Sequence, residues 1–162
     1  MAQLCAWGTQ MANVAAKTAK TEHFRKLEQM YLAAPINAFY APTIWISHGE
    51  AEITIPVKPE FFHAANAVHG SVYFKLLDDA AFFAVNSMID DYFALTASFT
   101  TYLLRPVTEG TMKASGKVVW SGGKSYLAES VVVDNEGREI ARGNGNFVAS
   151  KIKLTADMGY CF

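Results

Sequence analysis

The sequence has few cysteines and no surplus of charge of either sign, and each absence excludes a class of protein. Its two cysteines, Cys5 and Cys161, lie near opposite ends of the chain. They predict neither a disulfide framework nor a zinc knuckle. With 14 basic and 15 acidic side chains, the formal charge is −1. This balance argues against nucleic acid as a partner, because phosphate binding needs a surplus of Lys and Arg.

The sequence also lacks a long apolar run, although 51% of its 162 residues are hydrophobic. The longest dense stretch, residues 80–89, is interrupted by Asn86 and Ser87 and is too short to cross a bilayer. The first sixteen residues have neither the basic start nor the apolar core of a secretory signal. We therefore expect one folded domain in the cytoplasm with no membrane partner.

The spacing of apolar residues predicts two helices and a hairpin in the first half of the chain. Residues 20–34 carry one apolar stripe at helical spacing, and Pro35 is expected to end this helix. Residues 43–57 alternate around a turn at His48 and Gly49, which predicts a β-hairpin. Residues 71–87 predict a long helix that is apolar on nearly every face and must therefore be enclosed by other elements.

The second half of the chain supplies strands that could enclose this helix. Tight turns connect them and favour antiparallel pairing. The expected strands cover residues 95–103, 111–120, 125–133 and 139–154. Helices and strands are segregated along the chain, so the fold class is α+β. We expect a helical N-terminal extension over residues 1–38, a main domain over 39–155 and a C-terminal tail over 156–162.

Several common catalytic motifs are excluded by spacing. Gly123, Lys124 and Ser125 match the end of a phosphate-binding loop, but its first glycine would fall at Val118, and a strand follows instead of a helix. The sequence also lacks G-x-S-x-G, G-x-G-x-x-G and H-E-x-x-H. Serine-hydrolase, dinucleotide and metalloprotease chemistry are therefore not expected, and no metal site is predicted.

Polar residues gather where the long helix is expected to begin, at His63, Asn66, His69, Gly70 and Ser71. The first turn of a helix has unpaired N–H groups and a positive dipole end, and a glycine there lets a polarised carbonyl approach closely. This arrangement suits an oxyanion hole. The structural alternative is that Ser71 caps the helix and Gly70 relieves the turn.

Two adjacent carboxylates, Asp78 and Asp79, lie inside the same helix. They point about 100° apart around its axis, so they cannot both face one site. Lys75 is three residues from one and four from the other, and either aspartate could form an ion pair with it. The other would be a partly desolvated carboxylate with a raised pKa, suited to act as general base or nucleophile.

Several sequence features, taken in order along the chain, resemble those of a family of known fold. They are an acidic residue nine positions after the histidine of a His-Gly motif, a strand ending in an aromatic residue and a proline, and an Asp-x-x-Gly turn before the last strand. In this sequence they are His69-Gly70-Ser71, Asp78, Tyr102 to Arg105-Pro106, and Asp134 to Gly137. Over residues 40–152 the chain resembles the hotdog-fold acyl-CoA thioesterases, in the branch named after the phenylacetate-pathway (PaaI-like) thioesterase.

The resemblance implies a fold, an activity and an assembly. The fold is a single hotdog domain over residues 39–155, in which a curved antiparallel sheet wraps one long helix. The implied activity is hydrolysis of an acyl-CoA thioester to a free acid and coenzyme A, with no metal or dissociable redox cofactor. The family forms homodimers that often pair into homotetramers, and its active site lies between two chains.

The resemblance also assigns roles to residues. Asp78 matches the catalytic carboxylate, the N–H of Gly70 would polarise the thioester carbonyl, and Thr96 matches the hydroxyl that helps hold the attacking water. The family usually has an asparagine six residues before the motif histidine. This chain has His63 there and Asn66 three residues later, and either could orient the water or the carbonyl.

The remaining substrate-binding candidates are His69, Ser71, which replaces the second glycine of the family motif, and Lys124 with Ser125. In such thioesterases a Gly-Lys-Ser turn often lies near the nucleotide end of coenzyme A, where lysine can meet phosphate. The alternative for that turn is an ordinary solvated hairpin. Two other functions remain open at this stage, namely a hydratase or dehydratase acting on acyl thioesters and a non-catalytic acyl-CoA-binding regulatory module.

Overall fold

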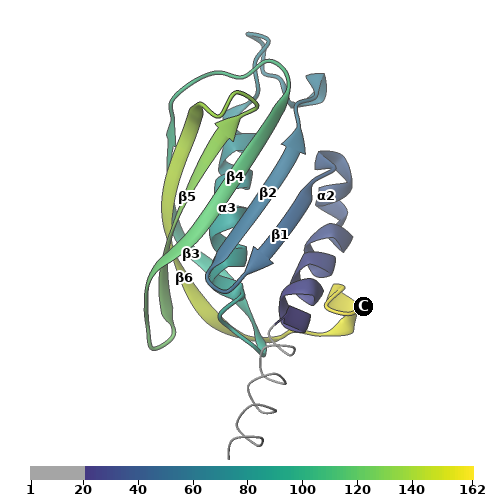
Figure 1. The fold of residues 1–162 in the computed structure, drawn as a ribbon, viewed down its shortest axis with the longest axis vertical. Helices are drawn as coiled ribbons and strands as arrows, with labels where there is room; N and C mark the ends of the chain where they lie inside the picture. The colour runs from purple at the N-terminus through teal and green to yellow at the C-terminus, as the bar shows by residue number, and fades with distance from the viewer. Residues whose placement is uncertain (1–20) are drawn as a thin grey trace, which may run out of the picture.

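A computed structural model describes residues 21–162, and in it one long helix is wrapped by a six-stranded antiparallel sheet (Figure 1). The strand order is β1-β2-β4-β5-β6-β3. The strands are β1 (Thr43–Ser47), β2 (Glu50–Pro56), β3 (Tyr92–Leu103), β4 (Thr111–Gly122), β5 (Ser125–Asp134) and β6 (Glu139–Lys153). The predicted α+β class, the hairpin and the four later strands are confirmed.

The enclosed helix is α3 (Gly70–Asn86), within one residue of the predicted bounds at each end. Small residues on α3 let it approach the sheet closely. A Cβ atom added to Gly116 of β4 would overlap the carbonyl oxygen of Ala80. Because the backbones touch here, a side chain at position 116 would have to push the helix away from the sheet.

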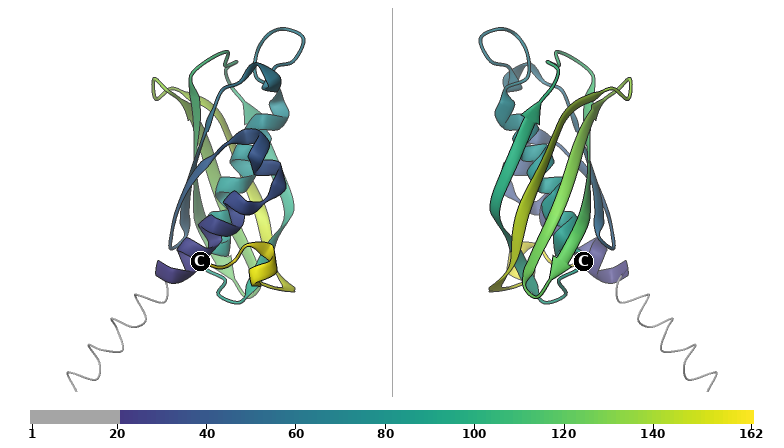
Figure 2. Two further views of the ribbon diagram at one scale, coloured as in Figure 1. Left: turned by 90° about the vertical axis from the view of Figure 1, so that its right-hand side faces the viewer. Right: turned by 90° about the vertical axis from the view of Figure 1, so that its left-hand side faces the viewer.

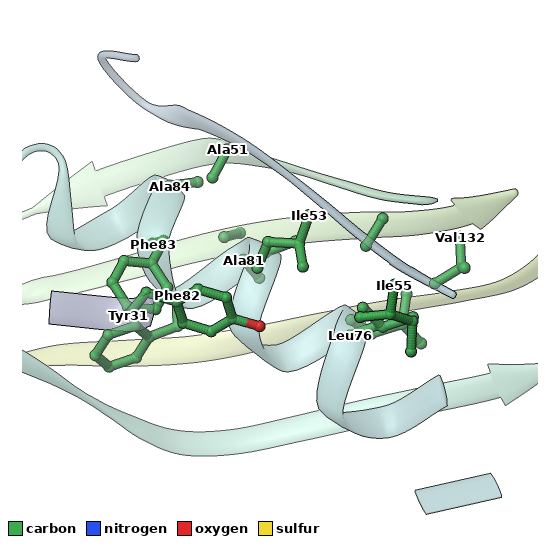
Figure 3. Close-up of a cluster of buried hydrophobic side chains, with 14 of the residues drawn as sticks. Tyr31, Ala51, Ile53, Ile55, Leu76, Ala81, Phe82, Phe83, Ala84 and Val132 are labelled. Atoms are coloured by element: carbon green, nitrogen blue, oxygen red, sulfur yellow. The ribbon is translucent and has the colours of Figure 1, made fainter. Parts of the chain in front are cut away.

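The core lies between α3 and the inner face of the sheet. Figure 3 shows Ile53 and Ile55 of β2 beside Ala81 and Leu76 of α3, with Val132 of β5 next to them. All five side chains are at most 1% exposed. Each buried Ile or Leu side chain contributes about 1.5–3 kcal/mol. This packing holds α3 along the sheet and thereby places its polar residues.

The first described segment, residues 21–33, is helical and packs on α3. Leu27 is fully buried, and the Tyr31 ring lies 5.0 Å from the ring of Phe83. This helix stops before Pro35, as predicted. Pro35 then opens a second short helix, α2 (Pro35–Tyr40), which the sequence analysis did not foresee. Proline favours the first position of a helix because the N–H that it lacks has no partner there.

The C-terminal segment folds back along the helix of residues 21–33 (Figure 2). A single 3-10 turn, η2 (Ala156–Met158), ends at Gly159, which has a φ of 85°. Another such turn, η1 (Pro59–Phe61), precedes α3. The predicted boundaries at residues 38/39 and 155/156 stay a prediction, and the first twenty residues of the extension lie outside the described part. No helix within residues 21–162 is long and apolar enough to cross a membrane.

Candidate active site

A cavity of about 850 Å³ lies between the helix of residues 21–33, α3, the start of β3 and the η2 turn. Most of its wall is apolar. The large apolar side chains that line it include Met30, Ile36, Phe82, Phe83, Phe93, Leu95 and Met158. Asp78, Asp79, Lys75 and Thr96 also line it. An apolar cavity with a few convergent polar groups is the usual form of a small-molecule site.

Asp78 faces this cavity from the middle of α3. The hydroxyl of Thr96 on β3 donates a hydrogen bond to its Oδ1 atom (3.0 Å). Burial raises the pKa of Asp78 to about 6, while the Thr96 hydrogen bond lowers it, nearby Asp79 raises it and Lys75 lowers it. A carboxylate whose pKa lies near the working pH is both ionised and basic enough to accept a proton.

Asp79 is held in a different environment one residue along the helix. Its Oδ2 atom accepts a hydrogen bond from the Tyr31 hydroxyl (2.9 Å) and forms an ion pair with Lys75. Burial raises its pKa, and Lys75 and Tyr31 oppose that rise. The Lys75 ammonium also lies 4.9 Å from the centroid of the Tyr40 ring. Asp79 thus ties α3 to the N-terminal helices and has a charged partner, whereas Asp78 has only the Thr96 hydroxyl. Both carboxylates line the cavity, so the expectation that they cannot both face one site is wrong, because one apolar stripe of a helix is wide enough to include both positions.

The N-terminus of α3 forms a second polar group of residues. His69 is the N-cap, and its side chain accepts a hydrogen bond from the backbone N–H of Ser71 (3.1 Å). The predicted alternative that Ser71 caps the helix is therefore wrong, because Ser71 lies within the first turn and its hydroxyl is 2.8 Å from His69 Nδ1. A Cβ atom on Gly70 would come 3.0 Å from a methyl group of Leu103. Glycine keeps space open at this end of the helix.

His63 and Asn66 belong to the turn that precedes α3. The backbone N–H of Ala65 donates to His63 Nδ1 (3.1 Å), and Asn66 adopts a left-handed conformation with a φ of 58°. The rings of His63 and His69 are 6.4 Å apart. His63 therefore lies close to the N-cap of α3, and the roles of His63 and Asn66 in the site stay predictions.

Lys124 lies in the turn between β4 and β5, and Ser125 is the first residue of β5. Ser125 pairs with Val148 of β6, and Val148 pairs with Leu95 of β3. Figure 1 shows this turn near the end of α3, away from the helix N-terminus. Within one chain the structure does not bring Lys124 together with the residues at the mouth of the helix.

The cavity wall contains residues that the sequence analysis missed. Met30, Phe93 and Met158 come from three segments far apart in the chain. Apolar residues at these positions give no signal in the sequence that separates a cavity wall from ordinary core. They become recognisable only when the segments are placed around Asp78.

Comparison with known proteins agrees with this architecture. The family model described as the thioesterase superfamily matches residues 65–141, which include α3 and β3 to β5. This chain has a hotdog fold and is similar to the thioesterase superfamily over those residues. The expected resemblance is confirmed at that level. Among curated proteins, none matches the sequence.

Solved structures show the same fold over most of the chain. The PaaI protein from the phenylacetic acid degradation operon of Escherichia coli superposes with a TM-score of 0.77 at 21% identity, covering 84% of this chain and 99% of that one. A thioesterase family protein from Silicibacter pomeroyi has a TM-score of 0.72 at 22% identity and covers 77% and 96%. A thioesterase from Haemophilus influenzae has a TM-score of 0.69 at 14% identity and covers 75% and 87%. At these identities the likeness shows the fold.

Proposed function

We propose that this protein is a thioesterase that hydrolyses acyl-CoA to a free acid and coenzyme A, acting in the cytoplasm. The observation that carries the proposal is Asp78, a carboxylate with its pKa raised to about 6, facing an apolar cavity beside the Thr96 hydroxyl. The thioesterase fold supplies the context.

In the proposed reaction Asp78 acts on the thioester carbonyl in one of two ways. As a general base it takes a proton from a water held by Thr96, and the resulting hydroxide adds to the carbonyl carbon. As a nucleophile it attacks that carbon directly, and water then hydrolyses the anhydride. In both routes the C–S bond breaks, the sulfur leaves as the thiolate of coenzyme A and takes up a proton. Neither route uses a metal or a redox cofactor.

The oxyanion that forms needs a hydrogen-bond donor, and Gly70 is the proposed one. Gly70 and Asp78 are eight residues apart on one helix, about 12 Å along its axis. A single carbonyl cannot meet both within one chain. We therefore propose a homodimer or larger homo-oligomer in which Asp78 acts with Gly70 of the partner subunit.

The edge of the sheet supports such an assembly. β3 is an edge strand of twelve residues. Its side chains Leu95, Tyr102 and Leu103 are exposed, and so is Phe74 on α3. A long apolar edge strand favours pairing with another chain. Pairing along β3 would also bring the cavity of one subunit toward the second copy, because Leu95 lines that cavity.

The remaining predicted residues are proposed to position the attacking water and the substrate. His63 or Asn66 orients the water or the carbonyl, and His69 and Ser71 line its approach at the helix N-terminus. Lys124 and Ser125, which lie away from that end within one chain, would meet a phosphate of coenzyme A bound across two subunits.

The deciding experiment measures free thiol released from a panel of acyl-CoA substrates. Thiol release that is lost in Asp78→Asn and kept in Asp79→Asn supports the proposal. Addition of water to an enoyl-CoA without thiol release would instead show a hydratase. Binding of acyl-CoA without either reaction would show a regulatory module, and both outcomes contradict thioester hydrolysis as the function.

A further inference from the structure

The cavity beside Asp78 extends along α3 from Lys75 to Phe83, and segments outside the family match also line it. Residues 30–37 line one side, and residues 156–159 line another. Both segments lie outside residues 65–141. The part of the chain that is common to the superfamily thus supplies Asp78, while other segments supply much of the apolar wall.

The η2 turn is fixed in place by specific contacts. A Cβ atom on Gly159 would come 2.9 Å from the Cβ atom of Ala33, so the turn lies tightly on the N-terminal helix. The hydroxyl of Tyr160 is 2.6 Å from His23 Nδ1. The other ring nitrogen of His23 donates to the carbonyl of Asn86, the last residue of α3 (3.1 Å). The C-terminal segment is therefore anchored to both helices next to the cavity.

Met158 is the large apolar side chain of this turn. It lines the cavity and packs against the buried core. Asn86, which the anchoring histidine reaches, is eight residues beyond Asp78, about 12 Å along the helix. An apolar acyl group that starts at a carbonyl near Asp78 and runs along α3 for about that distance would approach the η2 turn. This corresponds to an acyl group of medium length.

The charged residues around the cavity disfavour acyl groups that carry a carboxylate at their far end. Asp78, Asp79 and Asp157 line it together with Lys75, whose ammonium is paired with Asp79. The net charge of the lining is negative. An acyl group with a carboxylate at its far end would be repelled and would lose hydration without gaining a partner.

We propose that Met158 sets the upper size limit of the acyl group and that the site takes neutral, apolar acyl groups of medium length. This inference rests on the proposed function for the identity of the thioester. Met158 is a specificity-determining residue that contacts the acyl group at a distance from the reacting carbonyl. A misfit of about one methylene in such a pocket changes recognition by roughly 10- to 200-fold.

The test uses S-alkyl thioethers of coenzyme A, which cannot be hydrolysed. Binding of the ethyl, octyl and hexadecyl thioethers, and of a thioether with a terminal carboxylate, is measured by calorimetry with the full-length protein. The variants are Met158→Trp, which fills the cavity, and Met158→Ala, which extends it. Ile152→Trp and Ile152→Ala are the matched controls, because Ile152 is an exposed apolar residue six positions earlier that does not line the cavity.

The native protein is expected to bind the octyl thioether more tightly than the ethyl and carboxylate-bearing ones. Met158→Trp should weaken octyl binding by about tenfold relative to ethyl binding, and Met158→Ala should improve hexadecyl binding relative to octyl binding by a similar factor. The Ile152 variants should keep the native order. Equal effects of Met158 variants on all lengths, or no length preference in the native protein, would overturn the inference.

This experiment separates the two proposals. A length preference that responds to Met158, in a protein that releases no thiol from any acyl-CoA, would retain the inference about the pocket and refute thioester hydrolysis. Thiol release with no response to Met158 would do the reverse. If Met158→Trp fails to fold, as judged by near-ultraviolet circular dichroism, the hexadecyl binding of Met158→Ala decides the question.

Discussion

Replacing Asp78 with asparagine should remove activity and at the same time stabilise the protein. The pKa of Asp78 is raised from 3.8 to about 6, chiefly by burial. The folded protein therefore holds this proton more tightly than the unfolded chain does. Native stability consequently falls as the pH rises through that window, and the loss is complete above a pH of about 6. Asparagine keeps the shape of the side chain and has no charge to bury.

The size of the effect follows from the shift. Raising the pKa of a carboxyl group from 3.8 to about 6 corresponds to about 3 kcal/mol. Asp78 lies at an open cavity where solvent screens part of this cost, so we expect a gain of about 1–2 kcal/mol in the free energy of unfolding at neutral pH. Near pH 4 the gain should vanish, because the native carboxyl is then protonated. The same substitution should reduce kcat/KM by about 10²- to 10⁴-fold, since a general base is lost.

Urea unfolding measures the free energy of unfolding of the native protein and of Asp78→Asn. It is carried out at several pH values between acid and neutral. Thiol release from one good acyl-CoA measures the activity. Asp79→Asn is the matched control, one residue away on the same helix. It should keep most of the activity, and it should not gain stability because loss of its ion pair with Lys75 offsets the relief of burial. An Asp78→Asn protein that is no more stable at neutral pH, or equal gains for both variants, would refute the reasoning.

Four further outcomes follow from the structure. Thr96→Val should move the acid limb of the pH profile of kcat/KM to higher pH by about one pH unit, because the hydrogen bond that it removes stabilises the ionised form of Asp78. An acid limb that does not move contradicts that role for Thr96. His63→Asn should keep the acid limb in the same assay, and loss of the limb would make the histidine the titrating base. Sedimentation at micromolar concentration should show a dimer or larger species, and a fully active monomer would contradict a shared site. Gly116→Ala should lower the free energy of unfolding in urea by about 3 kcal/mol, because the added methyl group would overlap the carbonyl oxygen of Ala80. An unchanged urea midpoint would mean that α3 can move away from the sheet at no cost.

The elements of this fold were predictable because their signals are local. Alternation over residues 43–57 needs only neighbouring residues to indicate two strands and a turn, and the structure has β1 and β2 there with Gly49 at a positive φ. The all-round apolar character of α3 required an enclosing sheet, since such a helix cannot lie on a single surface. Helix α2 was missed because six residues that begin with a proline carry too short a pattern.

The two aspartates show where local reasoning stops. Their separation of about 100° around the helix follows from helix geometry alone, and it implies that they face different surroundings. Which surroundings each one meets depends on Tyr31, about fifty residues earlier, and on Thr96, eighteen residues later. The resemblance to thioesterases favoured Asp78 as the catalytic residue by its distance from His69, and that assignment stays a prediction.

The sequence by itself determined the α+β class, the enclosed helix, the order of the strands along the chain and the two candidate carboxylates, because hydrophobic periodicity and turn chemistry act between residues close in sequence. Only the tertiary structure decided how the strands are arranged, that both aspartates line one cavity while Asp79 alone is paired with Lys75, and that Met30, Phe93 and Met158 surround that cavity. A cavity wall is built from segments distant in sequence, and its apolar residues have the same composition as the core. The distinction arises only when packing leaves space between them.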